Sequence, residues 1–250
     1  MKGRFIHIVL LCLIPLLGWS QNFHKMVAGM NELSLPLINV EVDINSVSNE
    51  YFVPGHITIA EYKDSTVETN SYNCQLRYRG MLALTLPKKA FSVKLVDERG
   101  EKLDANLLGL RTDNSWILDA MGFDKLRMRN RVCFDIWNEY NHTVWNTNFD
   151  NRNGTVGTMV EVFINSRYHG IYCLSDKINR QLLNLKKAKE ENDGSVTVKG
   201  LLYKGNGNST SNTLLDYYED SVDSVEWNQF ELQYPDDYPS LQTSHSISSV

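Results

Sequence analysis

The sequence lacks the common signatures of hydrolytic, phosphate-loop and metal-dependent proteins. Its 250 residues contain no GxSxG, HExxH, GxxxxGKS/T or EF-hand motif. The six histidines are scattered, and no two of them have the spacing that places metal ligands on one face of a helix. The sequence therefore gives no support to a serine hydrolase, a zinc peptidase, a P-loop nucleotidase or a calcium-binding module, and it predicts no metal site.

Cysteine is also scarce. Cys12 lies in an N-terminal apolar run, and the other three cysteines, Cys74, Cys133 and Cys173, are widely spaced. An odd number without a CxxC pair is not the framework of a small disulfide-rich domain. We expect three small core residues, although one bridge with one thiol left over stays open.

Only one long apolar run exists, over residues 5–17. Met1-Lys2-Gly3-Arg4 precedes it and Gly18-Trp19-Ser20-Gln21 follows it. Two positive charges, a short apolar stretch and small residues before a cleavage point are typical of a secretory signal peptide. The run is too short to span about 30 Å of hydrocarbon as an anchor. We predict cleavage after Ser20 and a secreted or periplasmic, cell-envelope protein whose mature chain has no transmembrane anchor.

The charge of the chain is unevenly distributed. The formal net charge is −5, which argues against a dedicated nucleic-acid binder. Residues 77–131 nevertheless hold 12 Lys and Arg against 7 Asp and Glu, while no Lys or Arg follows Lys204 and eight acidic residues do. An anionic ligand is therefore expected in the basic middle of the chain.

Hydrophobic periodicity predicts a mixed fold. Alternating apolar and polar residues predict strands over residues 37–43, 57–59, 74–79 and 91–96. A hairpin is expected from Val160 to Leu174, with its turn at Asn165-Ser166. Helical spacing predicts one helix from Lys125 onward and another over 178–189. These elements indicate an α+β fold with a mostly antiparallel sheet and two main helices.

Cations on the predicted strands and helices are the candidate functional residues. Lys94 lies on a predicted strand whose apolar residues face the other way, so it either meets solvent or is placed to contact a phosphate. Arg129 falls on the apolar stripe of the predicted helix, where a buried charge must be paired. It therefore forms a core ion pair or lines a cleft. From their positions, Lys88, Lys89, Arg127 and Arg131 are expected to be solvated.

Five short motifs follow one another between residues 75 and 204. The first motif is RG at 79–80 with KKAFSVKL at 88–95, and the second is LLGL at 107–110 with NSWIL at 114–118. The third is RMRNR at 127–131. The fourth is VEVFIN at 160–165 with YHGIY at 168–172 and DKI at 176–178, and the fifth is GLLYK at 200–204. In this order they resemble the spore-coat-protein CotH family of atypical, kinase-like proteins. The resemblance implies a fold like a kinase N-lobe and the use of ATP with Mg²⁺ or Mn²⁺ to phosphorylate secreted or surface proteins. It makes Lys94, Arg79, Lys89, Arg129 and Lys177 candidates for nucleotide contacts.

Two departures from the family pattern matter. After Arg79-Gly80 the family usually has a polar run, whereas residues 81–86 read MLALTL, which we expect to prefer burial. In the family the Asp-containing metal motif lies on a C-terminal lobe, and only 46 residues follow Lys204. We predict a signal peptide at 1–20, a CotH-like N-lobe region at 21–204 and an acidic, incomplete start of a C-lobe at 205–250. The chain would then be catalytically incomplete, or alternatively a non-catalytic secreted binding or surface-assembly module.

Overall fold

The computed structural model describes residues 22–140, 154–192, 195–205 and 230–235. The predicted signal peptide and most of the predicted acidic segment lie outside these residues. The chain divides into two compact units, one made of Met1–Phe134 with Val156–Asp176 and the other of Asp135–Thr155 with Lys177–Val250. In the described part of the chain, no helix is both long and apolar enough to cross a membrane.

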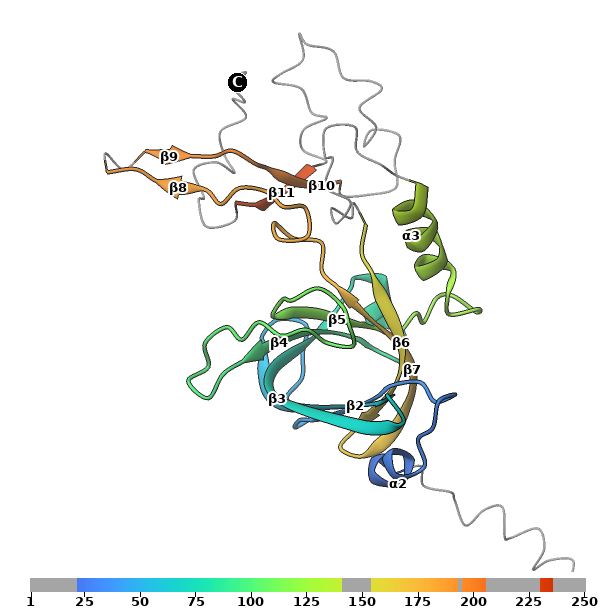
Figure 1. Ribbon diagram of the computed structural model, residues 1–250. Helices are drawn as coiled ribbons and strands as arrows, with labels where there is room; N and C mark the ends of the chain where they lie inside the picture. Colours follow the sequence, from blue (N-terminus) through green and yellow to red (C-terminus); the bar gives the residue numbers. More distant parts are fainter. Residues whose placement is uncertain (1–21, 141–153, 193–194, 206–229, 236–250) are drawn as a thin grey trace, which may run out of the picture. The chain divides into compact units, whose positions relative to one another are not determined.

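Seven strands of the first unit form a closed barrel in the order β1-β2-β3-β4-β5-β7-β6 (Figure 1). In chain order they are β1 (Leu37–Glu41), β2 (Val53–Lys63), β3 (Thr66–Arg79), β4 (Ala90–Val96), β5 (Ser115–Asp119), β6 (Gly157–Ile164) and β7 (Arg167–Asp176). Neighbouring strands pair antiparallel, except that β1 and β6 run parallel and close the ring. Closure removes the exposed sheet edges that an open sheet would present.

The predicted α+β class, resembling a kinase N-lobe with two main helices, is wrong. The first unit is mostly β, and its sheet is closed rather than open. Residues 178–189, predicted as the second helix, form no helix: residues 180–184 are turns, 185–188 are irregular, and Lys189 belongs to a strand. The Asn179 side chain accepts a hydrogen bond from the backbone N–H of Leu182, and Asn184 adopts a φ of 50°. A residue in the left-handed region ends helical hydrogen bonding, and apolar spacing does not reveal it.

The strand predictions are confirmed. The four alternating runs lie in β1 to β4, and the hairpin is β6–β7. Its two turn residues, Asn165 and Ser166, have φ values of 50° and 63°. Positive φ at both central residues is the type I′ geometry, whose twist matches that of the flanking strands.

Helix α3 (Arg129–Tyr140) begins four residues later than Lys125, the predicted start. Arg127 has a φ of 55°, which breaks helical geometry before that point. The Asp124 carboxylate accepts hydrogen bonds from the backbone N–H groups of Leu126, Met128 and Arg129, and the bond from Arg129 is the main cause of its lowered pKa. Asp124 thus satisfies the amides at the helix start.

The apolar stripe of α3 faces outward, not into a core as predicted. Of the residues predicted to form it, Leu126 is 67% exposed, Ile136 is 53% exposed and Trp137 is 52% exposed. Arg131, predicted to be solvated, is the buried residue of this helix at 9% exposure. Periodicity identified the stripe but not the side that meets the rest of the fold.

Side chains from all seven strands contribute to the first unit's main core. Trp116, Tyr172, Leu118 and Leu174 are among its fully buried members. On β4, Phe91, Val93 and Leu95 face this core, while Ser92 and Lys94 lie on the other face, as the alternation predicts. Helix α2 (Phe23–Ala28) covers the outside, where the ring of Phe23 packs 5.5 Å from that of Phe163.

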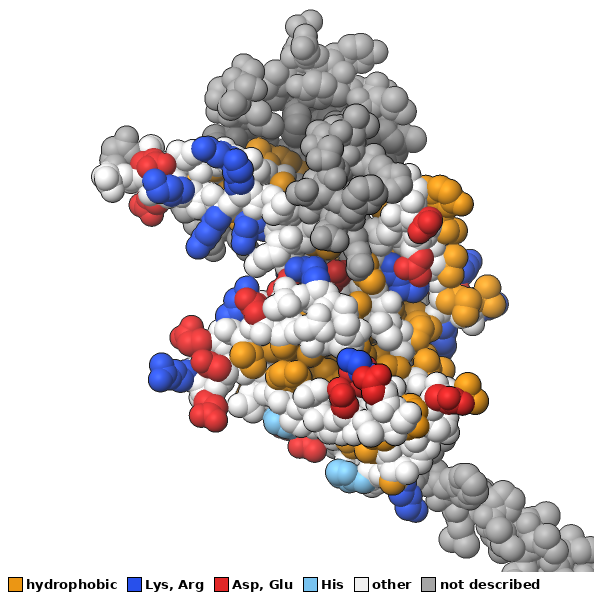
Figure 2. Space-filling view, viewed as in Figure 1, with side chains coloured by type: hydrophobic (Ala, Val, Ile, Leu, Met, Phe, Trp, Pro, Cys, Tyr) orange, Lys and Arg blue, Asp and Glu red, His pale blue; other side chains and the backbone are white. Residues whose placement is uncertain are grey.

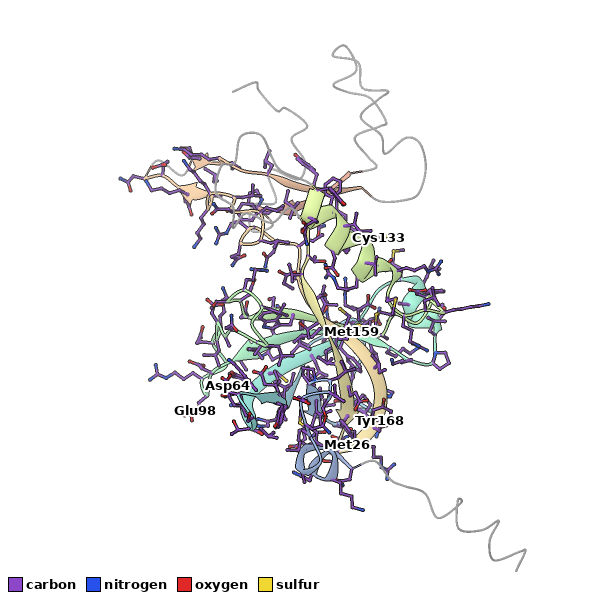
Figure 3. The ribbon with its side chains drawn as sticks, turned by 45° about the vertical axis from the view of Figure 1, so that its right-hand side comes forward. Met26, Asp64, Glu98, Cys133, Met159 and Tyr168 are labelled. Carbon is purple, nitrogen blue, oxygen red and sulfur yellow. The ribbon has the colours of Figure 1, made fainter. Side chains whose placement is uncertain are left out.

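The antiparallel order assigns each loop to one of two barrel ends. Loops 42–52, 80–89 and 120–128 and the turn 165–166 lie at one end, here called end A. The turn 64–65, the loop 97–114 and the exit from β7 at Asp176 lie at the other, end B. Charged side chains line the side of the barrel where loop 97–114 lies (Figure 2). Figure 3 labels Asp64 and Glu98, which belong to two connections of end B, and Tyr168, which lies toward end A.

The second unit contains short strands. β8 (Lys189–Glu190) pairs with β9 (Val196–Thr197), and β10 (Leu202–Gly205) pairs with β11 (Phe230–Tyr234). The Tyr234 hydroxyl accepts a hydrogen bond from the backbone N–H of Ala188, 2.5 Å away, which ties β11 to the segment before β8.

Candidate anion-binding site at end A of the barrel

Three cations from the β3–β4 connection and the loop after β5 converge at end A. Arg79 is the last residue of β3, Lys88 precedes β4, and Arg127 follows β5. Register explains the convergence, because Arg79 pairs with Ala90 at the start of β4 and Asp119 pairs with Cys173 on β7. The loop containing Lys88 includes the short 3-10 helix η2 (Leu82–Thr85) and starts at Gly80, whose φ of 97° favours glycine.

Lys88 covers the apolar barrel interior at this end. Its Nζ lies 4.0 Å from the centroid of the buried Tyr172 ring and donates a hydrogen bond to the Ile171 carbonyl. A cation over an aromatic face gains electrostatic attraction. Burial and the charge of Arg127 lower the pKa of Lys88 to about 8, while Asp119 acts in the opposite direction.

Arg79 and Arg127 share this environment. Burial lowers the pKa of Arg79, and the Asp119 carboxylate opposes that shift. The Arg127 guanidinium donates to the Ala120 carbonyl at 3.1 Å. Burial and then Tyr78 raise the pKa of Tyr172, and the positive charge of Arg127 counteracts them.

The cluster carries a surplus of positive charge. Three cations lie around one carboxylate, Asp119, whose Oδ1 accepts a hydrogen bond from the backbone N–H of Met121. Within residues 22–140, 154–192, 195–205 and 230–235, Arg79, Lys88 and Arg127 have no carboxylate within 4.0 Å. Partly desolvated cations without a matched counter-charge attract an anion.

Gly170 on β7 leaves room for Lys88. It has a φ of 104°, and a Cβ added there would lie 3.4 Å from Lys88 Nζ. The sheet register shifts beside it, between Val162 and Phe163, which leaves His169 as the extra residue of a bulge. Burial and then the charge of Lys88 lower the pKa of His169.

Replacing Gly170 by alanine is expected to lower the free energy of unfolding by about 1–3 kcal/mol, measured by denaturant titration. A side chain there is strained by the positive φ and also crowds Lys88. Gly109→Ala is the matched control, because Gly109 has a φ of 73° with nothing within 4 Å of an added Cβ. Equal losses in the two variants would contradict a role for the Lys88 contact.

The predicted nucleotide contacts are spread over several places. Lys94 lies on the outer face of β4, with Nζ 4.3 Å from the centroid of the Phe52 ring. Lys89 donates to the Leu84 carbonyl and so ties down its own loop. Arg129 is 64% exposed and its Nε pairs with Asp124 Oδ1 at 2.7 Å, so it is neither a core ion pair nor a group lining a described cleft. Lys177 is an exposed residue of the second unit. Of the five, only Arg79 belongs to the cluster.

Lys88, which the sequence assigned to solvent, is half-buried, while Arg127 is exposed as expected; the sequence did not predict that the two lie near each other. Neither residue follows a hydrophobic period, so no local pattern separates them from surface cations. The available signal was their position, since both lie in motifs of the resemblance, Lys88 just before a predicted strand and Arg127 near the start of a predicted helix. Only strand order shows that these positions meet at one barrel end.

A second charged cluster lies at end B and is closed by ion pairs. Arg111 pairs with Asp113 and Asp176, and Asp176 also accepts a hydrogen bond from the backbone N–H of Val156 at 3.0 Å. Burial raises the pKa of Asp176, opposed by the Val156 amide and by Arg111. These bonds join the loop before β5 to the end of β7, so this cluster serves the fold.

Metal ligands do not gather in the described residues. Across residues 22–140, 154–192, 195–205 and 230–235 there is no group of three or more His, Cys, Asp or Glu side chains that could hold an ion. Among the described cysteines, Cys74 and Cys173 are buried, and Cys133, expected in the core, is exposed.

The fold and the site define a mostly β protein with a closed barrel and an electropositive barrel end. Residues 76–245 match the family described as CotH kinase protein. The match covers more than half of the chain, and the protein belongs to this family. It includes all three cations of the cluster and the Arg111 network. No curated protein matches the chain.

Proposed function

We propose that this protein binds the phosphate chain of ATP at end A, as the nucleotide-binding part of a CotH-type phosphotransferase that acts on secreted or surface proteins. The single supporting observation is the group of Arg79, Lys88 and Arg127, in which Arg79 and Lys88 are partly desolvated, Arg127 is exposed, and Asp119 is a nearby carboxylate. A polyphosphate supplies the missing negative charge and several strong hydrogen-bond acceptors.

The residues fit phosphate better than they fit a metal ion. Arginine and lysine donate to phosphate oxygens, and in phosphoryl transfer such groups stabilise charge on those oxygens. Mg²⁺ or Mn²⁺, when bound to a nucleotide, supplies further charge neutralisation. Asp119 acts on both Arg79 and Lys88, and no group of three or more His, Cys, Asp or Glu side chains that could hold an ion exists in the described part of the chain, so no metal ligand set is assigned here.

Export to the cell envelope is the second part of the proposal. It is supported by the sequence of residues 1–21, with its two cations, apolar run and small residues before Gln21. N-terminal sequencing of protein recovered outside the cytoplasm should begin at Gln21. A chain recovered there with Met1 intact would contradict cleavage.

Calorimetric titration of the purified chain tests binding. ATP and inorganic tripolyphosphate are both expected to bind saturably, because the cluster contacts the phosphates that the two ligands share. Affinity should fall with added salt. No saturable binding of either ligand would overturn the proposal.

Transfer chemistry is tested separately with γ-labelled ATP, Mg²⁺ or Mn²⁺, and a generic acceptor protein. Label on the acceptor or on the chain itself supports a phosphotransferase. Saturable ATP binding without any transfer would contradict that activity and favour the non-catalytic binding module, which the same cation cluster would serve.

Phosphate affinity is expected to fall as the pH rises through about 8, the pKa of Lys88. The amine is protonated and attracts phosphate below this value, and it becomes neutral above it. Titrations with tripolyphosphate between pH 7 and pH 9.5 measure the effect. Lys88→Arg, which stays charged over this range, should flatten the profile. An identical pH profile in the variant would rule out Lys88 as the titrating group.

A further inference from the structure

Large apolar side chains project from two loops at end A and from the first turn of helix α3. They are Met81, Leu82, Phe123, Leu126, Met128 and Val132, and we call them the end A apolar surface. Met81 is 87% exposed and Leu82 is 73% exposed, although the sequence predicted burial of this run. A monomeric soluble protein rarely exposes so many large apolar groups close together, and such a surface commonly marks an interaction site.

The two loops that carry these residues are in contact. Gly122 and Leu86 belong to different loops, and a Cβ added at Gly122 would lie only 2.5 Å from the Leu86 side chain. Figure 3 places η2 and the start of α3 on the same side of the barrel. The six side chains therefore project from one continuous region of the first unit.

Positive charge is interleaved with this apolar surface. Lys125, Arg127 and Arg129 alternate with Leu126 and Met128 along the chain. On the facing side of Figure 2, hydrophobic and basic side chains adjoin near the start of α3. Residues 77–96 contain no Asp or Glu.

Negative charge near the surface is already neutralised. Asp124 is the only acidic residue between 120 and 134, and its side chain is 12% exposed. Its oxygens accept bonds from the side chain of Arg129 and from backbone N–H groups of the helix start. The surface that meets a partner is therefore apolar and cationic.

We propose that the end A apolar surface binds the face of an anionic phospholipid bilayer. The apolar side chains would enter the boundary between head groups and acyl chains, and the interleaved cations would meet lipid phosphates. Projection favours lipid over a protein partner, because the anchors of protein interfaces fill closely packed pockets. Met81 and Leu82 instead stand free at the tip of a loop, where they can insert. This inference does not depend on ATP binding.

Sedimentation with vesicles tests the proposal. Vesicles of phosphatidylglycerol and phosphatidylcholine in equal parts should bind the purified chain, and vesicles of phosphatidylcholine alone should bind it at least about tenfold more weakly. Binding to the mixed vesicles should decrease as salt is added. Equal partitioning into both kinds of vesicle, or into neither, would overturn the proposal.

Variants distinguish insertion of the end A apolar surface into the bilayer from nonspecific adsorption to vesicles. Leu82→Ser combined with Phe123→Ser should weaken binding about tenfold or more. Lys125→Glu should weaken it by a further factor of about five to twenty-five. The matched controls are Leu33→Ser, at an apolar residue that is 90% exposed, and Lys63→Glu, at end B; both should bind like the parent.

Two results would refute the lipid assignment. Controls that lose binding as much as the test variants would show a general surface effect. Light scattering that reveals a dimer of the parent chain and a monomer of the Leu82→Ser, Phe123→Ser variant would show that the surface joins two copies instead. Tm measurements accompany each variant, because these exposed substitutions should leave stability within about 0.5 kcal/mol of the parent.

Discussion

Replacing Arg111 by alanine is expected to lower the free energy of unfolding by about 3–5 kcal/mol. Arg111 Nη1 lies 2.5 Å from Asp113 Oδ2, and Arg111 Nε lies 3.2 Å from Asp176 Oδ2. The two carboxylate side chains are only 1% and 2% exposed. Removing the guanidinium leaves both carboxylates buried without the cation that they share, and an uncompensated buried charge is costly. Denaturant unfolding of the purified chain measures the loss.

Two further sets of variants test the prediction for Arg111: a control substitution in the same loop and a double-mutant cycle with Asp176. Arg99→Ala removes an exposed arginine from the same loop at end B and should change stability by no more than about 0.5 kcal/mol. Asp176→Asn should itself be destabilising, but the double variant with Arg111→Ala should lose less than the sum of the single losses. Strict additivity, or equal effects of Arg99→Ala and Arg111→Ala, would contradict a shared buried network.

Replacing Lys88 and Arg127 together by methionine is expected to weaken ATP and tripolyphosphate binding at least about 100-fold. A hydrogen bond to a charged group contributes about 1.5–3 kcal/mol, and this variant removes two such donors. Methionine keeps an unbranched apolar stem, so the packing of Lys88 over Tyr172 is largely retained. Calorimetric titration with both ligands measures the loss, and a Tm measurement confirms that the variant is folded.

Substitutions at two other lysines serve as controls for this test. Lys63→Met at end B should bind both ligands like the parent. Lys94→Met examines the family-based assignment, because Lys94 lies on the outer face of β4 against Phe52 and not in the cluster. The Lys94→Met substitution should lower the affinity for both ligands by less than about threefold. A loss with Lys94→Met and none with the double variant would move the phosphate site from end A to the outer face of β4.

Strands were predictable from the sequence because alternation reports a local property. A strand with one buried face must place apolar residues two apart, as Phe91, Val93 and Leu95 do on β4. The turn at Asn165-Ser166 was predictable for a similar reason, because few residue types accept two positive φ angles. These signals depend only on neighbours in the chain.

The helices were less predictable because periodicity does not show which side meets the fold. On α3 the stripe with Ile136 and Trp137 is exposed, and Arg131 is buried instead. The predicted helix over 178–189 had apolar spacing, yet Asn184 takes a left-handed conformation and the segment forms no helix. Packing partners and single backbone angles decide such cases, and both are tertiary properties.

The sequence by itself determined the strands, the main hairpin, the basic middle of the chain and the family motifs that carry it. Only the tertiary structure decided that the sheet closes, through the parallel pairing of β1 with β6 across more than 100 residues. The antiparallel pairing of β3, β4 and β5 brings the ends of β3 and β5 and the start of β4 to one barrel end, where Arg79, Lys88 and Arg127 meet. Arg127 is about 40 to 50 residues from the other two along the chain, and electrostatic attraction depends on distance in space rather than on separation along the chain.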